Sequence, residues 1–138
     1  MTEVRTKLID GMRFVAIPQS GHAIVLDTDR DKGGFDSAPR PMELLLISLA
    51  GCTAMDVIYI LRKMKVEPEE FEVMVRSERA ETHPKVYRKT EITYLLRGKD
   101  IPEDKVKQAI ELSQNKYCAV SATMRAVGEI NYNYKIVE

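Results

Sequence analysis

A long apolar stretch over residues 42–65 separates two parts of the chain that both show the alternation typical of β-strands. Between residues 3 and 28, apolar and polar side chains alternate with a period of two, as in half-buried strands. Asp10-Gly11 and Ser20-Gly21 are turn-forming dipeptides that divide this region into three short runs. The pattern therefore predicts a three-stranded β-meander.

A polar loop over residues 29–40 leads into the apolar stretch, which only a few small or polar residues interrupt: Ser48, Gly51, Thr53 and Asp56. A helix that is hydrophobic nearly all round is expected to be buried on all sides. Its length approaches that of a membrane span, about 18 residues, but the polar interruptions and the amphipathic character of the other regions favour a core helix. One 138-residue chain is short for surrounding such a helix. We therefore expect a partner subunit over it, in an obligate homodimer.

The remaining chain, residues 66–138, predicts strands, then a helix, then a strand. Alternation over 71–75 and 86–96 indicates two strands, with Tyr87 on the face opposite Ile92. Pro102 and Glu103 begin a helix that runs towards Cys118, residues 119–125 form a short further helical piece, and 130–136 form a last strand. The order βββ-α-ββ-α-β defines an α+β class, with antiparallel sheets wrapped around a long buried helix. No linker divides it, so we expect a single domain over 1–138.

Composition and the absence of known motifs argue against several classes of function. The 21 basic and 21 acidic side chains cancel, so no basic excess indicates a nucleic-acid or anionic-membrane partner. The N-terminus has no apolar signal core, and a cytoplasmic location is expected. Motifs for dinucleotides, phosphates or a nucleophilic serine are absent. The two histidines, His22 and His83, stand far apart in the sequence without a C-x-x-C, so neither a metal site nor another cofactor is expected.

The two cysteines, Cys52 and Cys118, are the candidate reactive groups. A structural disulfide is not expected in a reducing compartment, and the simplest interpretation of either thiol is a small buried hydrophobe. The small neighbours of Cys52, in Ala50-Gly51-Cys52-Thr53, leave room for a ligand at the sulfur. Burial in an apolar helix raises a thiol pKa, so a reactive thiolate here needs a cation or strong donors nearby.

Two segments carry a family resemblance. Residues 41–57, PMELLLISLAGCTAMDV, resemble the central-helix motif of the OsmC/Ohr family, in particular its small OsmC-like branch, and residues 117–121, YCAVS, resemble the second-cysteine motif of that family. The resemblance implies an intertwined homodimer that reduces organic hydroperoxides. Cys52 would be the peroxidatic cysteine and Cys118 the resolving one. A dithiol or a lipoylated protein would be the reductant.

The resemblance also implies an arginine that stabilises the thiolate and a glutamate that holds this arginine. Arg13 matches the family's Gly-x-Arg setting, in Gly11-Met12-Arg13, and Arg40 beside the helix entrance is a second candidate. The family's glutamate commonly follows the motif proline, where this chain has Met42. Glu43 is one residue later, about 100° around the helix. It therefore does not simply replace the missing side chain, but it can stabilise the helix N-terminus.

The departure at Met42 keeps two alternatives open. One is a non-catalytic dimeric module that binds a hydrophobic or electrophilic small molecule, or senses redox state, through Cys52. The other is a hotdog-like acyl-thioester hydrolase with Glu43 or Asp56 as its carboxylate. Asp56 is one helical turn beyond Cys52 and can neighbour its thiol, so we count it as a supporting residue in either case.

Overall fold

The chain forms two compact units in the computed structural model, which describes all 138 residues: residues 1–46 and residues 47–138. The first unit holds an antiparallel sheet in the order β1-β2-β3, built from β1 (Val4–Asp10), β2 (Arg13–Pro18) and β3 (Ile24–Leu26). The predicted meander is therefore confirmed, with a shorter third strand. Gly11, in the β1–β2 turn, has a φ of 51°, in the left-handed region that glycine adopts without a Cβ penalty.

The loop after β3 contains a short 3-10 turn, η1 (Arg30–Lys32), and is organised by Asp27. The Asp27 carboxylate accepts hydrogen bonds from the backbone N–H of Thr28 (2.8 Å), Phe35 (3.1 Å) and Ser37 (3.1 Å), and from the Ser37 hydroxyl (2.6 Å). Burial would raise the pKa of this carboxyl, but the four hydrogen bonds outweigh burial and lower the pKa to about 2. Asp27 thus acts as the internal anchor of the loop.

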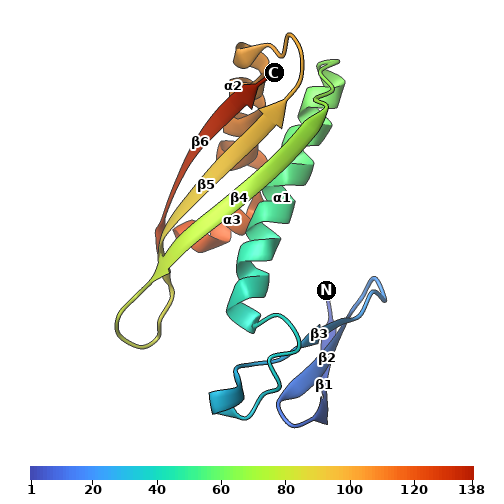
Figure 1. Cartoon of the computed structure of the whole chain (residues 1–138), viewed down its shortest axis with the longest axis vertical. Coiled ribbons are helices and arrows are strands. Elements are labelled where there is room, and N and C mark those ends of the chain that lie inside the picture. The colour runs from blue at the N-terminus through green and yellow to red at the C-terminus, as the bar shows by residue number, and fades with distance from the viewer. The chain divides into compact units, whose positions relative to one another are not determined.

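The second unit is built on a sheet in the order β4-β5-β6, with β4 (Glu70–Arg79), β5 (Tyr87–Arg97) and β6 (Glu129–Val137) (Figure 1). β4 and β5 are antiparallel, but β6 runs parallel to β5, so the expectation of purely antiparallel sheets is wrong for this sheet. Parallel neighbours need a long crossover connection. It is supplied by α2 (Glu103–Leu112), the π-helical turn η2 (Ser113–Tyr117) and α3 (Ala119–Arg125).

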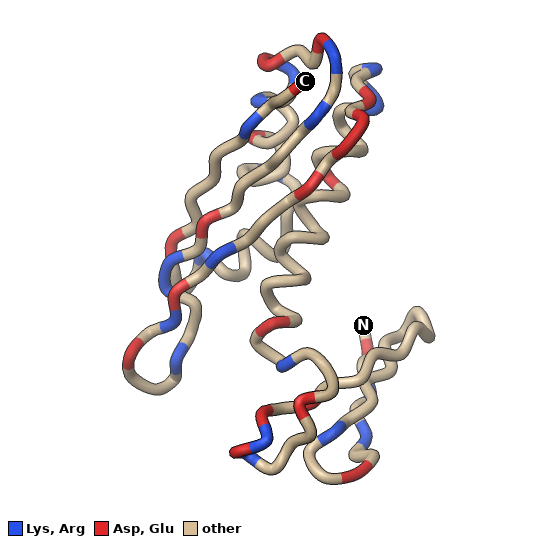
Figure 2. The backbone as a smooth tube through the Cα atoms, in the orientation of Figure 1, with Lys and Arg blue, Asp and Glu red and all other residues tan.

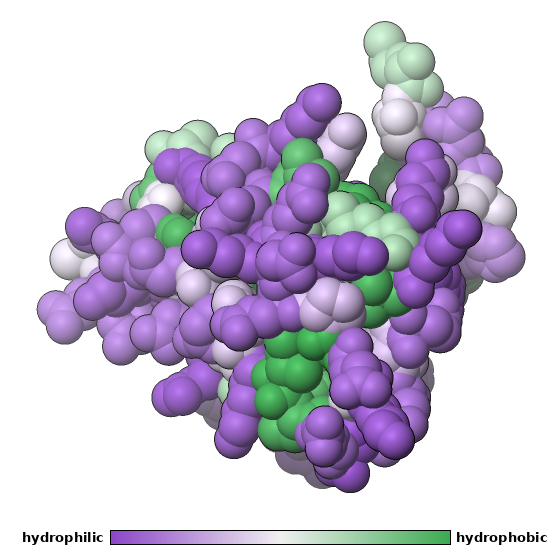
Figure 3. All heavy atoms as spheres, turned by 90° about the horizontal axis from the view of Figure 1, so that it is seen from above, coloured by the Kyte–Doolittle hydropathy of each residue, from purple (hydrophilic) through white to green (hydrophobic).

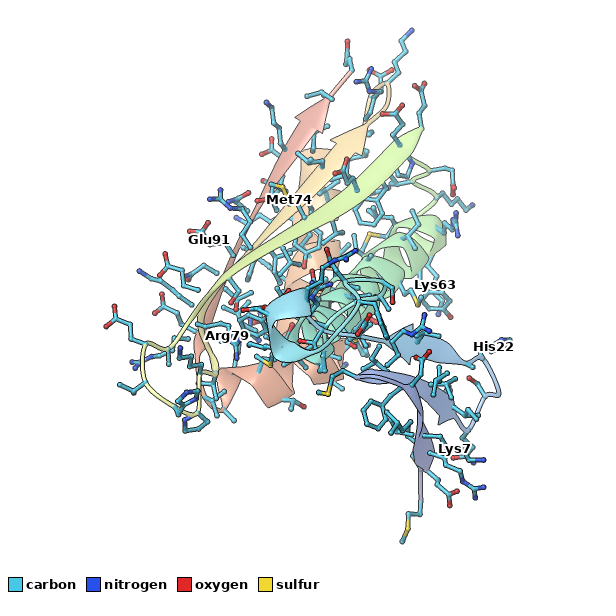
Figure 4. The ribbon with its side chains drawn as sticks, turned by 60° about the horizontal axis from the view of Figure 1, so that its bottom comes forward. Lys7, His22, Lys63, Met74, Arg79 and Glu91 are labelled. Carbon is cyan, nitrogen blue, oxygen red and sulfur yellow. The ribbon has the colours of Figure 1, made fainter.

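The core of this unit lies between the sheet and α1 (Pro41–Lys63), α2 and α3, which occupy the same face of the sheet (Figure 1). α1 contributes a buried stripe at intervals of four residues, Leu49, Thr53, Val57 and Leu61. β5 contributes Ile92, Tyr94 and Leu96, and α2 contributes Val106, Ala109 and Ile110. The outer face of the sheet is exposed, including Met74 and Glu91 (Figure 4).

Tyr87 does not follow the predicted alternation of β5. It is buried, because the pairing of β4 and β5 shifts register between Glu78 and Arg79, so that Arg79 pairs with Tyr87 while Glu78 pairs with Lys89. An extra residue in one strand reverses the faces of the side chains beyond it. The prediction that Tyr87 faces away from the core is therefore wrong.

α1 is not buried on all sides within the chain, contrary to expectation. Its stripe is buried, but Ile47, Met55 and Tyr59 are 57%, 72% and 60% exposed. The sequence has no charged residue between Glu43 and Asp56, and α1 is drawn mostly in tan in Figure 2. By length and composition α1 is the one helix that could cross a membrane, and 22% of its apolar window is buried. The helix therefore presents an uncovered apolar surface.

Residues 1–46 have no apolar core of their own. Asp27 is the one buried residue among them. Large apolar side chains are exposed on the three strands: Val4, Leu8, Ile9, Ile17, Ile24 and Val25. Hydrophobic side chains are not confined to this unit at the surface, because green patches also lie among purple hydrophilic side chains on the face of the molecule that Figure 3 draws from above. Three short strands without a covered face are not expected to be stable alone, so this unit needs a covering surface. The single domain expected over residues 1–138 stays a prediction.

Candidate thiol site

Cys52, Asp56 and Cys118 meet in the second unit, although they come from different elements. The two Sγ atoms and a carboxylate oxygen of Asp56 all lie within 4.8 Å of one another. α1 supplies Cys52 and Asp56 one helical turn apart, as the sequence predicted. Both cysteines are free thiols, Cys52 partly exposed and Cys118 only 3% exposed. The fold thus pairs an accessible thiol with a buried one.

The π-helical turn η2 delivers Cys118 to this place. The Cys118 N–H donates to the Ser113 carbonyl oxygen at 2.7 Å, and the chain then leaves helical geometry, with φ −73° and ψ 99° at Cys118. The Cys118 sulfur accepts a hydrogen bond from the Ser121 N–H at 3.4 Å and so occupies the capping position of α3, where an oxygen side chain is more usual. π-helical turns are frequent at functional sites.

The surroundings of Cys52 oppose ionisation of its thiol. Burial raises the pKa of Cys52. A hydrogen bond from the Val120 N–H lowers it, while the Cys118 thiol and the Asp56 carboxylate raise it further. The net direction is upward. A reactive Cys52 thiolate therefore needs a cation in addition to the groups around it in this unit.

A buried polar network lies next to the thiol site and is hydrogen-bonded to Asp56. Thr53 Oγ1 lies 2.6 Å from the Tyr94 hydroxyl and 2.8 Å from Ser113 Oγ, and the Gln114 amide donates to both Thr53 (3.0 Å) and Tyr94 (3.1 Å). Ser113 in turn donates to Asp56 Oδ2 at 2.9 Å. Burial raises the pKa of Tyr94 to about 12, so the phenol is neutral. The network fixes the orientation of the Asp56 carboxylate.

The network continues to α3 through Gln114. Its side-chain oxygen accepts from the Ser121 hydroxyl and from Arg125, both at 3.0 Å, and its backbone oxygen accepts from Arg125 at 2.6 Å. No buried side-chain nitrogen or oxygen lacks a partner. Sequence reasoning missed this network. The one available signal was the position of Thr53 within the apolar stretch, and nothing indicated its partners.

Arg13 and Arg40 belong to the first unit and have carboxylate partners there. The Arg13 guanidinium donates twice to Asp10, at 2.7 and 2.6 Å, and stacks 5.0 Å from the centre of the Phe35 ring. Arg40 donates to both Asp29 and Asp36. The role of either arginine as the thiolate-stabilising residue stays a prediction.

Glu43 is placed at the start of α1. Its carboxylate accepts a hydrogen bond from the Arg40 N–H at 2.9 Å, which is the reciprocal half of a capping box. This contact satisfies a backbone donor at the helix N-terminus. It agrees with the expected effect of Glu43 on the helix start.

Comparison with known proteins gives a consistent family. The model of a family described as "OsmC-like protein" matches residues 34–133. Protein YhfA of Escherichia coli (strain K12) is 33% identical over 135 residues, which cover 98% of each chain. The OsmC-like resemblance inferred from the two cysteine motifs is thereby confirmed.

Solved structures share the fold over nearly the whole chain. A hypothetical protein from Aquifex aeolicus VF5 is 32% identical, with a TM-score of 0.82 over 100% of this chain and 98% of that one. An organic hydroperoxide resistance protein from Elizabethkingia anophelis, 15% identical, has a TM-score of 0.68 over 100% of this chain and 95% of that one. These likenesses confirm the α+β fold class.

Proposed function

The chain belongs to the OsmC-like protein family, and from this premise we propose that it reduces organic hydroperoxides with its own pair of thiols. The observation that carries the proposal is the approach of the Cys52 and Cys118 sulfur atoms within 4.8 Å. The likeness to an organic hydroperoxide resistance protein supports the substrate class. The decisive experiment is the measurement of peroxide consumption by the reduced protein and by its Cys52→Ser and Cys118→Ser variants, with loss of turnover in Cys52→Ser as the expected result.

The difference in exposure between the two thiols supports a separate role for each. Cys52 is the more accessible thiol, so its thiolate attacks the distal oxygen of the hydroperoxide. The O–O bond breaks, Cys52 becomes a sulfenic acid, and the alkoxide takes a proton and leaves as an alcohol. The Cys118 thiol then attacks the sulfenic sulfur, forming a disulfide and releasing water. An external dithiol, such as a lipoylated protein, reduces the disulfide by exchange and is itself oxidised.

The apolar surface of α1 favours organic peroxides over hydrogen peroxide. Met55, one turn from Cys52 on the helix, is 72% exposed. An alkyl group that packs between this surface and the partner subunit proposed below gains about 0.8 kcal/mol for each buried methylene. Hydrogen peroxide has no group that makes this contact.

We further propose that a second copy of the chain covers the exposed apolar surfaces, giving a homodimer. Both units present such surfaces: Met55 and Tyr59 on α1, and the strands of the first unit. A membrane is the other apolar environment that α1 could enter. The hydrogen-bonded Thr53 and Asp56 in the middle of the helix favour a protein partner. The balanced charge of the chain favours no nucleic-acid partner.

Two observations favour a second candidate, a non-catalytic binding or redox-sensing module. The pKa of Cys52 is raised, and Arg13 and Arg40 are both paired with carboxylates. A thiol without a cation reacts slowly with peroxide. This alternative predicts that small hydrophobic molecules raise the melting temperature without being consumed.

A further inference from the structure

We propose that the reduced site binds one thiophilic divalent cation, with Zn²⁺ as the representative ion, through the Sγ atoms of Cys52 and Cys118 and a carboxylate oxygen of Asp56. The three donor atoms already lie within 4.8 Å of one another. Around a tetrahedral zinc ion with Zn–S bonds of about 2.3 Å, two sulfurs stand about 3.8 Å apart. Small side-chain rotations therefore suffice to close the site.

The donor set suits zinc. Thiolates are soft ligands and a carboxylate is a common third ligand, and zinc sites with three protein ligands keep a fourth position for water. The two histidines were the residues considered for metal binding from the sequence, and neither belongs to this cluster. The site is instead built from the two cysteines and from Asp56, none of which was expected to bind a metal.

The groups around the donors are arranged as a second coordination shell. Ser113 donates to Oδ2 of Asp56, which fixes the carboxylate and leaves Oδ1 free to bind an ion. Thr53 holds Ser113 in turn. The Val120 N–H donates to the Cys52 sulfur, and the Ser121 N–H donates to the Cys118 sulfur. Such outer contacts orient ligands and stabilise their negative charge, and losing one typically lowers metal affinity about 10- to 100-fold.

Metal binding and disulfide formation exclude each other at this site, because both use the same two sulfurs. Binding of Zn²⁺ displaces one proton from each thiol and leaves two coordinated thiolates. A bound ion therefore keeps Cys52 from a peroxide and makes zinc a reversible inhibitor of the proposed reaction.

The test uses the reduced full-length protein with Co²⁺ as a spectroscopic probe and Zn²⁺ as competitor. We expect one Co²⁺ per chain, a thiolate-to-cobalt charge-transfer band that Zn²⁺ abolishes, and zinc protection of both thiols from alkylation. Cys118→Ser should lose most of the band. Asp56→Asn and Ser113→Ala should each weaken Zn²⁺ binding about tenfold or more, whereas Glu91→Gln on the outer face of the sheet should leave it unchanged.

Two results would overturn the metal site: cobalt binding without a charge-transfer band, or equal Zn²⁺ affinity in the wild-type protein and Asp56→Asn. Circular dichroism and thermal melting of each variant separate loss of ligand from loss of fold. The measurement involves no peroxide. A protein that binds zinc but consumes no hydroperoxide would support the metal site and refute the proposed reaction, while the reverse result would refute only the metal site.

Discussion

The Cys118 sulfur lies within 4.8 Å of the Cys52 sulfur, although β4, β5, α2 and η2 separate the two residues along the chain. Only the folded second unit creates this pair. A disulfide requires nearby Cα atoms and a specific side-chain geometry, and the proposed reaction requires the two free sulfurs to close from this separation to bonding distance.

Removing the Tyr94 hydroxyl should weaken the hydrogen-bond network next to the thiol site and destabilise the folded chain. Tyr94→Phe deletes a buried group that bonds to Thr53 and Gln114, so we expect the free energy of unfolding to fall by about 1–2 kcal/mol. Urea denaturation measures this change. Tyr134→Phe is the matched control, because it removes an exposed hydroxyl that donates to Glu103. An equal loss in both variants would contradict a structural role for the network.

Asp56 should hold the pKa of Cys52 up. Burial is the main cause of the raised pKa and Asp56 adds to it, so Asp56→Asn should lower the pKa. The pH dependence of Cys52 alkylation, measured in a Cys118→Ser background, should then shift to lower pH. A shift to higher pH would contradict the electrostatic role of Asp56.

Arg13 should act in the opposite direction if it is the thiolate-stabilising arginine. Arg13→Ala removes a cation, and we expect the alkylation profile of Cys52 to move to higher pH and peroxide consumption to slow. Arg5→Ala is the control, since Arg5 is an exposed arginine of the same unit that pairs with Glu3 at 3.7 Å. Identical profiles for the two variants would reject Arg13.

The anchor at Asp27 should make the first unit sensitive to acid. Its pKa is about 2 in the folded chain against an ordinary 3.8, so the folded state favours the charged carboxylate. This contribution to stability is complete above pH 3.8 and is lost as the pH falls towards 2. Asp27→Asn should lack this contribution to stability at every pH. The melting temperature should therefore change less with pH across this range in the variant than in the wild-type protein. An equal change of melting temperature with pH in both proteins would contradict the stabilising role of the Asp27 carboxylate.

A charge on the exposed face of α1 should break the proposed dimer. We expect light scattering to give twice the chain mass for the wild-type protein and a larger monomer fraction for Met55→Glu. Met74→Glu, at an exposed methionine on the outer face of the second sheet, should leave the dimer intact. A wild-type monomer, or dissociation by both variants alike, would contradict this interface.

Much of the fold was accessible from the sequence because its signals are local. Alternation and turn dipeptides identified the strands, and the apolar stretch identified α1 nearly to its ends. The parallel pairing of β6 was missed, because it depends on the crossover through α2 and α3 and not on any pattern within the strand. Because α1 is hydrophobic on nearly every side, its sequence also did not reveal which face packs against the rest of the chain.

The candidate site was predictable only in part. The motif settings identified Cys52 and Cys118, and helical spacing placed Asp56 beside Cys52. The network through Ser113 and Gln114 depends on the π-helical turn, whose extra residue per turn leaves no recognisable pattern in the sequence. Side chains that meet only through tertiary structure carry no local signal.

The most direct test of the proposed function is peroxide consumption by the purified, reduced protein. Cumene hydroperoxide and hydrogen peroxide are offered with a dithiol reductant to the wild-type protein, Cys52→Ser and Cys118→Ser. We expect turnover that prefers the organic peroxide, disappears in Cys52→Ser, and in Cys118→Ser stalls at a sulfenic acid or depends on direct attack by the reductant. Turnover that survives in Cys52→Ser, or its absence from a folded wild-type protein with both thiols reduced, would contradict the assignment.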